Sequence, residues 1–95
     1  MRREQALNIL REHKQELQNR YGITRLGIFG SVARDDADKS SDIDVVVEMA
    51  PDMLARADLK IELESILNEN VDVVRYWHRM NQYLKKRIDR EVYYV

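Results

Sequence analysis

The stretch that decides the fold runs from Gly30 to Asp44 and reads GSVARDDADKSSDID. It begins with a Gly-Ser pair after a strand-like stretch at 23–29, crosses a polar segment at 35–41, and ends in Asp-Ile-Asp before three valines. Glycine permits a tight turn and serine is favoured at helix N-caps, so a short helix is predicted to begin at Ser31. The stretch is therefore predicted to link one strand, through a helical turn and a polar loop, to a second strand.

The two carboxylates at the end of this stretch are predicted to share one face of the second strand. Side chains alternate along a strand, so Asp42 and Asp44 point one way while Ile43 points into the core. Two carboxylates about 4 Å apart repel by roughly 1 kcal/mol in water and by about 4 kcal/mol at an effective dielectric near 20. A bound cation offsets this repulsion, and oxygen-only ligands favour Mg²⁺. Taken alone, the pair also fits a solvated strand end.

A third carboxylate lies in the apolar segment Val71-Asp72-Val73-Val74. If this segment pairs with the strand that begins at Asp42, three carboxylates converge on one face of the sheet. Such a set can hold two metal ions about 3.5–4 Å apart for in-line attack at a phosphorus atom. On its own, Asp72 is also typical of an exposed position on an edge strand.

The Gly-Ser pair favours a phosphate site. Glycine lets a phosphate approach the backbone closely, and the Ser31 hydroxyl and the free N–H groups at a helix start can donate to an anion. Arg34 follows on the same turn and can reach a phosphate or pair with one of the aspartates. The alternatives are a simple strand-to-helix turn with Ser31 as its N-cap, and a surface ion pair for Arg34.

Predicted helices and strands alternate on both sides of this stretch. The expected elements are an amphipathic helix at 4–21 ended by Gly22, strands at 23–29, 42–48 and 71–75, helices at 53–70 and 77–90, and a short extended end at 92–95. Strands separated by helices predict an α/β layer with one sheet. In the last helix, the run Lys85-Lys86-Arg87 is typical of a solvated face, or of a patch that meets an acidic partner or an RNA.

Composition excludes several classes of protein. The 95 residues contain 16 Lys+Arg and 17 Asp+Glu, for a net charge of −1, and no cysteine. One domain over residues 1–95 is expected at this length. A pI of about 6.1 argues against a protein that grips long nucleic acid. With no cysteine, no long apolar run and no signal-peptide pattern, we expect a cytoplasmic protein without a disulfide scaffold or a membrane association.

Two segments together, Gly30-Ser31-Val32-Ala33-Arg34 and Ser41-Asp42-Ile43-Asp44, resemble the nucleotidyltransferases of the DNA polymerase β type. The Gly-Ser-x-Ala-Arg form and the small size look most like the minimal nucleotidyltransferases, which are the MNT antitoxin partners of HEPN-domain toxins. The resemblance runs from about residue 24 to 95 and includes the ending IDREVY at 88–93. It implies the α/β (α+β) fold of that superfamily, with a small mixed β-sheet flanked by helices. One position departs from the pattern, because Asp35 stands where the family often has glycine.

The resemblance also implies a role for each matching residue. Gly30 and Ser31 would hold the β- and γ-phosphates of ATP, and Arg34 would be a further nucleotide-binding residue. Asp72 would act as general base toward the accepting hydroxyl. The catalytic residues, which would also carry two Mg²⁺ ions, are Asp42, Asp44 and Asp72.

The resemblance finally implies a partner. Few residues follow the third strand, so the acceptor must be small or be held by another chain. In the MNT family that chain is the HEPN toxin, an RNase, and AMP is transferred from ATP to a tyrosine of the toxin within a hetero-oligomer. The expected function is therefore that of an antitoxin that AMPylates its toxin. The alternatives are an antitoxin that neutralises by binding alone, and a nucleotidyltransferase that acts on a small molecule such as an aminoglycoside.

Overall fold

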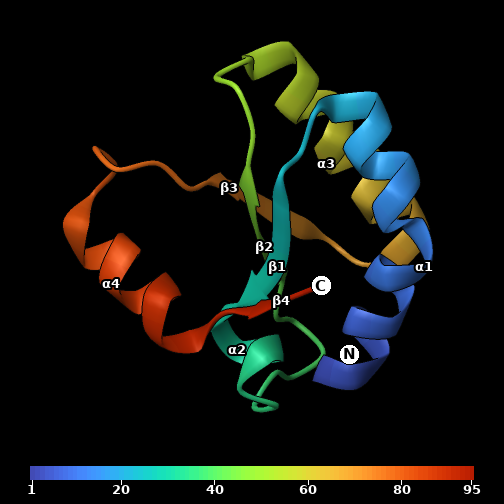
Figure 1. Cartoon of the computed structure of the whole chain (residues 1–95). Helices are drawn as coiled ribbons and strands as arrows, with labels where there is room; N and C mark the ends of the chain where they lie inside the picture. Colours follow the sequence, from blue (N-terminus) through green and yellow to red (C-terminus); the bar gives the residue numbers. More distant parts are fainter.

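The computed structural model describes the whole chain from Met1 to Val95, and it alternates helices and strands as expected (Figure 1). A mixed sheet flanked by helices confirms the predicted fold class. None of the helices has both the length and the apolar character needed to cross a membrane. In chain order the elements are α1 (Arg3–Tyr21), β1 (Arg25–Phe29), α2 (Gly30–Ala33), β2 (Ile43–Glu48), α3 (Met53–Leu67), β3 (Val71–Arg75), α4 (Gln82–Glu91) and β4 (Tyr93–Tyr94).

The sheet has the strand order β3-β2-β1-β4. Strand β1 runs antiparallel to both β2 and β4, whereas β2 and β3 are parallel. As a consequence, the end of β1 and the starts of β2, β3 and β4 all lie at the same end of the sheet. Residues that are distant in the sequence therefore meet there.

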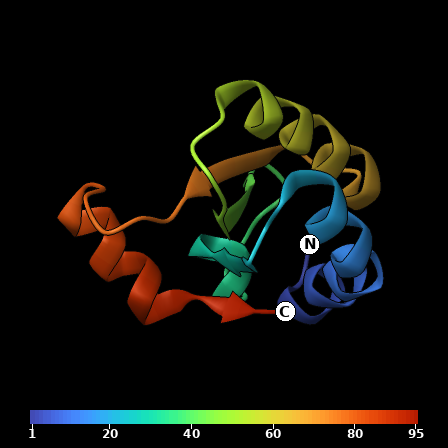
Figure 2. The ribbon, with the colours of Figure 1, turned by 45° about the horizontal axis from the view of Figure 1, so that its top comes forward.

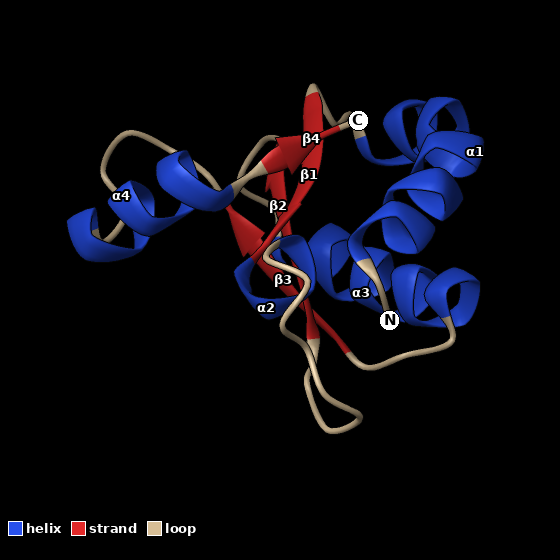
Figure 3. Ribbon diagram, turned by 90° about the horizontal axis from the view of Figure 1, so that it is seen from below, coloured by secondary structure: helices blue, strands red, loops and turns tan.

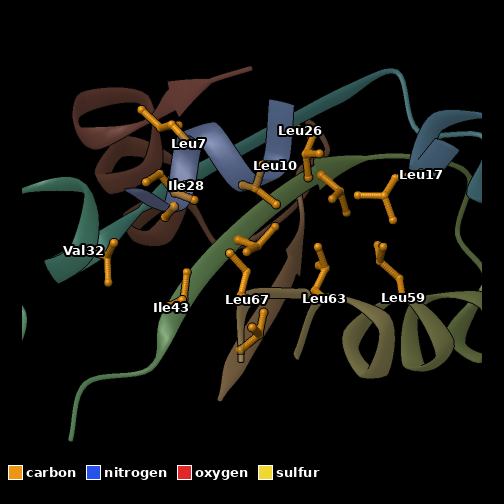
Figure 4. Close-up of a cluster of buried hydrophobic side chains, with 14 of the residues drawn as sticks. Leu7, Leu10, Leu17, Leu26, Ile28, Val32, Ile43, Leu59, Leu63 and Leu67 are labelled. Atoms are coloured by element: carbon orange, nitrogen blue, oxygen red, sulfur yellow. The ribbon is translucent and has the colours of Figure 1, made fainter. Parts of the chain in front are cut away.

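Helices α1 and α3 cover one face of the sheet and enclose the main core (Figures 3 and 4). Alternate residues of the strands point toward them, so Ile28 and Ile43 are 0% and 1% exposed. Burial of such side chains is worth roughly 1.5–3 kcal/mol each. The helices contribute the fully buried leucines Leu7, Leu10, Leu17, Leu59, Leu63 and Leu67.

Helix α4 lies on the opposite side of the sheet from α1 and α3 (Figures 1 and 2). A second, smaller cluster holds it there, in which Ile88 packs with Phe29, Val46 and Met80. Ile88 is the one fully enclosed residue of α4, so most of that helix is open to solvent. The face that α4 covers carries the acidic residues described below.

Two helix boundaries differ from the prediction by three residues or more, and local capping explains both. Helix α3 ends at Leu67 because Asn68 adopts a left-handed φ of 55°. Helix α4 begins at Gln82 because the Asn81 side chain accepts a 3.0 Å hydrogen bond from the Leu84 N–H. The left-handed cap predicted at Gly22, with a φ of 66°, is confirmed.

Candidate active site

The candidate site lies at the end of the sheet where β1 finishes and β2 and β3 begin. The turn Gly30-Ser31 continues directly from β1 into α2, and Asp44 and Asp72 stand near the starts of β2 and β3. The C-terminal part of α4 reaches the same end, since β4 pairs with β1 immediately after it. Figure 3 shows α2 and the loop after it at this end of the strands.

The parallel pairing of β2 and β3 brings the three aspartates to one face. Asp44 is the register partner of Asp72, and Asp42 precedes Asp44 by one alternation of the strand. Ile43, between the two acids of β2, is 1% exposed and points into the main core. Asp42 and Asp72 are exposed, whereas Asp44 is half-buried.

Asp44 has a perturbed acidity. Its pKa is raised above the ordinary value, first by burial and then by the charges of Asp72 and Asp42. The nearby cations of Arg87 and Arg34 oppose this rise. Because burial and neighbouring acids disfavour the ionised carboxylate, a cation close to Asp44 would stabilise it.

The chemistry of these residues fits a hard cation. Three carboxylates at neighbouring strand starts supply oxygen ligands, which Mg²⁺ prefers, and the unfavourable charge at Asp44 would be relieved by an ion. The side chains do not form a closed ligand cluster: no group of three His, Cys, Asp or Glu side chains is arranged to hold a metal. Strand pairing thus places the donors together, and their side chains would have to turn inward to share an ion.

Gly30 is required by the position of Asp44. Its φ is 77°, in the left-handed region that glycine adopts freely. A Cβ atom at this position would overlap Asp44 Oδ2 and lie 3.1 Å from Asp44 Cγ. The glycine therefore permits both the sharp turn out of β1 and the close approach of the carboxylate.

The prediction that Ser31 is the N-cap of the short helix is wrong. Helix α2 already includes Gly30, Phe29 occupies the N-cap position, and no side chain caps the helix. The reason is the left-handed Gly30, which turns the chain one residue before Ser31. The Ser31 hydroxyl makes no hydrogen bond within the chain, so it is free to donate to a ligand.

Arg34 lies beside the aspartates without an ion pair to any of the three. Its Nε donates to Asp36 Oδ2 at 3.0 Å and its Nη1 to Glu91 Oε1 at 3.0 Å. The hydrogen bond with Asp36 is the largest contribution that raises the pKa of Arg34. The alternative of a surface ion pair thus describes this conformation, and the side chain is 41% exposed.

The departure from the family pattern at Asp35 leaves the turn intact. Asp35 has a φ of 59°, so it adopts the left-handed conformation in which glycine is favoured. Aspartate tolerates this region better than most residues, because its short side chain forms local hydrogen bonds. Here its carboxylate accepts a 2.7 Å hydrogen bond from the backbone N–H of Arg3, which links the turn to the start of α1.

Two site residues, Arg87 and Glu91, were missed by the sequence prediction. The run that contains Arg87 predicts a solvated face or a patch for an acidic partner or an RNA, and the side chain is 44% exposed. Arg87 also lies near Asp44, and its guanidinium carbon is 5.7 Å from the centre of the Phe29 ring. Glu91 accepts a 3.0 Å hydrogen bond from the backbone N–H of Gly30, 61 positions earlier. No local spacing signals either contact, because each joins α4 to a residue at the end of β1 or the start of α2, far away in the sequence.

A basic cleft adjoins this group of residues. It has a volume of about 470 Å³ and does not include the three aspartates. Its walls come from the start of α1, the end of α2 and the end of α4. The residues that line it are Arg3, Ala33, Arg34, Arg90, Glu91 and Tyr93.

Comparison with known proteins identifies relatives over nearly the whole chain. The model of the family described as the nucleotidyltransferase domain matches residues 10–94. The protein adenylyltransferase MntA of Thermococcus cleftensis is 37% identical over 94 residues, which cover 97% of this chain and 94% of that protein.

Two solved structures share the fold. A structure described as a minimal nucleotidyltransferase has a TM-score of 0.78 and 35% identity, covering 98% of this chain and 95% of that chain. A chain of the toxin-antitoxin MntA-HepT has a TM-score of 0.64 and 26% identity, covering 93% of this chain and 68% of that chain. With a family model that spans most of its length and a relative at 37% identity, this chain belongs to the nucleotidyltransferase domain family.

Proposed function

We propose that this chain transfers AMP from ATP to a tyrosine hydroxyl of a partner HEPN RNase toxin, and that it acts as the antitoxin of that toxin. The observation that carries the proposal is the register of Asp44 opposite Asp72, beside the Gly30-Ser31 turn. A relative is named protein adenylyltransferase MntA, and a structural neighbour is the toxin-antitoxin MntA-HepT. Both support a protein acceptor held by a second chain.

The residues divide the chemistry between them. Ser31 and Arg34 bind the β- and γ-phosphates, and Gly30 gives them room to approach. Asp42, Asp44 and Asp72 would hold two Mg²⁺ ions, which when bound would neutralise charge on the attacking and leaving oxygens. Asp72 takes the proton of the tyrosine hydroxyl as its oxygen bonds to the α-phosphorus. The bond from that phosphorus to the bridging oxygen breaks, and pyrophosphate leaves.

The test is transfer of label from ATP labelled at the α-phosphate. The chain is incubated with Mg²⁺ and a partner HEPN protein, and label on the HEPN chain is measured. The double change Asp42→Asn with Asp44→Asn should abolish labelling. The matched control is Asp58→Asn, which removes an exposed carboxylate from α3 and should leave labelling unchanged. Absence of label on the wild-type pair with any divalent metal would contradict the proposal.

Neutralisation by binding alone is the second candidate, favoured by the description of MntA-HepT as a complex of toxin and antitoxin. The same double variant separates the two functions. If it binds the toxin and still suppresses its RNase activity, catalysis is dispensable and masking is the function. If it binds the toxin but no longer suppresses the RNase, AMP transfer is the function.

A further inference from the structure

A single carboxylate oxygen, Oε1 of Glu91, contacts three N–H donors at the edge of the site. It accepts 3.0 Å hydrogen bonds from the Gly30 N–H and from Arg34 Nη1, and it forms a 3.4 Å ion pair with Arg87 Nε. The Glu91 side chain is only 15% exposed, whereas those of Arg34 and Arg87 are 41% and 44% exposed. The mostly buried Glu91 carboxylate therefore pairs with two exposed guanidinium groups, Arg34 and Arg87, from different parts of the chain.

This arrangement holds two like charges close together. Two guanidinium groups repel each other unless an anion lies between them, and Glu91 supplies that anion. Each guanidinium has five N–H donors in a rigid plane, so fixing one or two of them orients the rest. Phe29 adds a surface for Arg87, whose guanidinium carbon lies 5.7 Å from the ring centre.

Both arginines lie close to Asp44, because the Glu91 oxygen that they share also accepts from the Gly30 N–H, and Gly30 lies against the Asp44 carboxylate. Each acts on Asp44 as a nearby positive charge, in opposition to Asp72 and Asp42. Glu91 also occupies the N–H of Gly30, so this group is already used within the chain. The donors left for a phosphate at this edge include the Ser31 hydroxyl and the remaining N–H groups of Arg34 and Arg87.

We propose that Glu91 is a positioning residue that holds Arg34 and Arg87 as a pair to receive the triphosphate of the nucleotide, with Arg87 as a further phosphate-binding residue. The proposal rests on the proposed function, since it assigns a nucleotide to this site. The proposal gives α4 a role in nucleotide binding, because α4 carries both Arg87 and Glu91. Bidentate contacts from arginine are a common means of holding phosphate oxygens.

The test is binding of AMP-PNP with Mg²⁺, measured by calorimetry on the whole chain. We expect Glu91→Gln and Arg87→Gln each to weaken binding by about tenfold, the effect of losing one charge-assisted contact. The double variant should lose less affinity than the product of the two single losses, because part of the effect of Glu91 acts through Arg87 and the rest through Arg34. Glu91→Asp, which keeps the charge, should recover part of the affinity.

The matched control is Glu16→Gln on α1. It also removes a carboxylate paired with an arginine four residues away, since Arg20 Nη2 lies 2.7 Å from Glu16 Oε1. It should leave AMP-PNP binding unchanged. Thermal unfolding of every variant measures stability separately from binding, and a purely structural role of Glu91 would lower the unfolding temperature without the coupling to Arg87.

Three results would overturn the proposal. One is AMP-PNP binding to Glu91→Gln as tight as, or tighter than, binding to the wild type, because Glu91 would then compete with the nucleotide. Another is a double variant whose loss of AMP-PNP affinity equals the product of the two single losses, because Glu91 and Arg87 would then act independently. The third is a wild-type chain that binds no AMP-PNP. A chain that shows the expected binding pattern but labels no partner supports this proposal while contradicting transfer to a toxin.

Discussion

Gly30 and the Asp44 carboxylate lie in direct contact, and they can do so only because glycine has no Cβ atom. A Cβ on residue 30 would overlap the Asp44 carboxylate, and its φ of 77° is itself unfavourable for other residues. The residue that shapes the turn therefore also sets the position of an acid on the next strand. Two predictions at the scale of single residues follow from this contact and from the charge of Asp44.

The first prediction concerns Gly30→Ala. The left-handed conformation alone should lower the free energy of unfolding by about 1–2 kcal/mol. Displacement of Asp44 should in addition reduce AMP transfer strongly. The control is Gly22→Ala, since Gly22 has a similar φ of 66° and nothing within 4 Å of an added Cβ. Gly22→Ala should lose stability but keep its activity. Equal activity of the two variants would contradict the role given to Gly30.

The second prediction concerns Asp44→Asn measured in EDTA. The pKa of Asp44 is raised by burial and by neighbouring acids, so its charge opposes folding at neutral pH. The variant should be more stable than the wild type at pH 7 while losing activity. The gain should shrink as the pH falls through the raised pKa, since the wild-type carboxyl becomes neutral in that range. Thermal unfolding from pH 7 to pH 4 measures it, and a gain that grows toward low pH would contradict the sign.

At the scale of elements, the short strand β4 helps to hold the end of α4 at the site, together with the packing of Ile88. It pairs with β1 through the register of Tyr94 with Gly27 and Tyr93 with Ile28, and the Val95 N–H donates to Leu26 O at 2.9 Å. A Cβ on Gly27 would lie 2.7 Å from the Tyr93 carbonyl oxygen and 2.9 Å from a Tyr94 ring carbon. Glycine at this position thus lets the last strand close onto the sheet.

The third prediction is that Gly27→Val pushes β4 away from β1. Overpacking of this kind costs about 1–3 kcal/mol. The amide of Val95 should exchange with solvent faster, because its hydrogen bond to Leu26 depends on the pairing. AMP-PNP affinity should fall as well, since Glu91 lies only two residues before this strand. Hydrogen exchange measured residue by residue tests this, and unchanged protection at Val95 would contradict it.

At the scale of the whole molecule, two hydrophobic clusters lie on opposite faces of one sheet. The radius of gyration of 12.3 Å is that of a compact chain of this length. Central strands β1 and β2 contribute side chains to both clusters, because residues alternate between faces. We therefore propose that residues 1–95 form one cooperative domain.

The fourth prediction is a single unfolding transition. Leu63→Ala in the main core and Ile88→Ala in the smaller cluster should each destabilise by about 2–5 kcal/mol and shift the same transition. Far-ultraviolet circular dichroism and the fluorescence of Trp77 should follow it together. A separate transition of α4, moved by Ile88→Ala alone, would contradict one cooperative unit.

The sequence by itself determined the order of helices and strands and the face that Asp42 and Asp44 share. Period-two alternation places Asp42 and Asp44 opposite Ile43, and the turn residues after β1 indicate the short α2, so these features needed no long-range information. The family pattern named the same residues through their spacing. The backbone conformation of Asp35 could not be predicted from the pattern, because only its φ of 59° shows that this aspartate adopts the left-handed conformation.

Only the tertiary structure decided which strands pair and what the last helix contributes. The register of Asp44 with Asp72 comes from the parallel β2–β3 pairing, and the contact between Glu91 and Gly30 spans 61 positions. Such contacts depend on how distant segments bury their apolar faces together, and no local periodicity encodes that. The run Lys85-Lys86-Arg87 therefore predicted only a helix surface, whereas folding brings Arg87 close to Asp44.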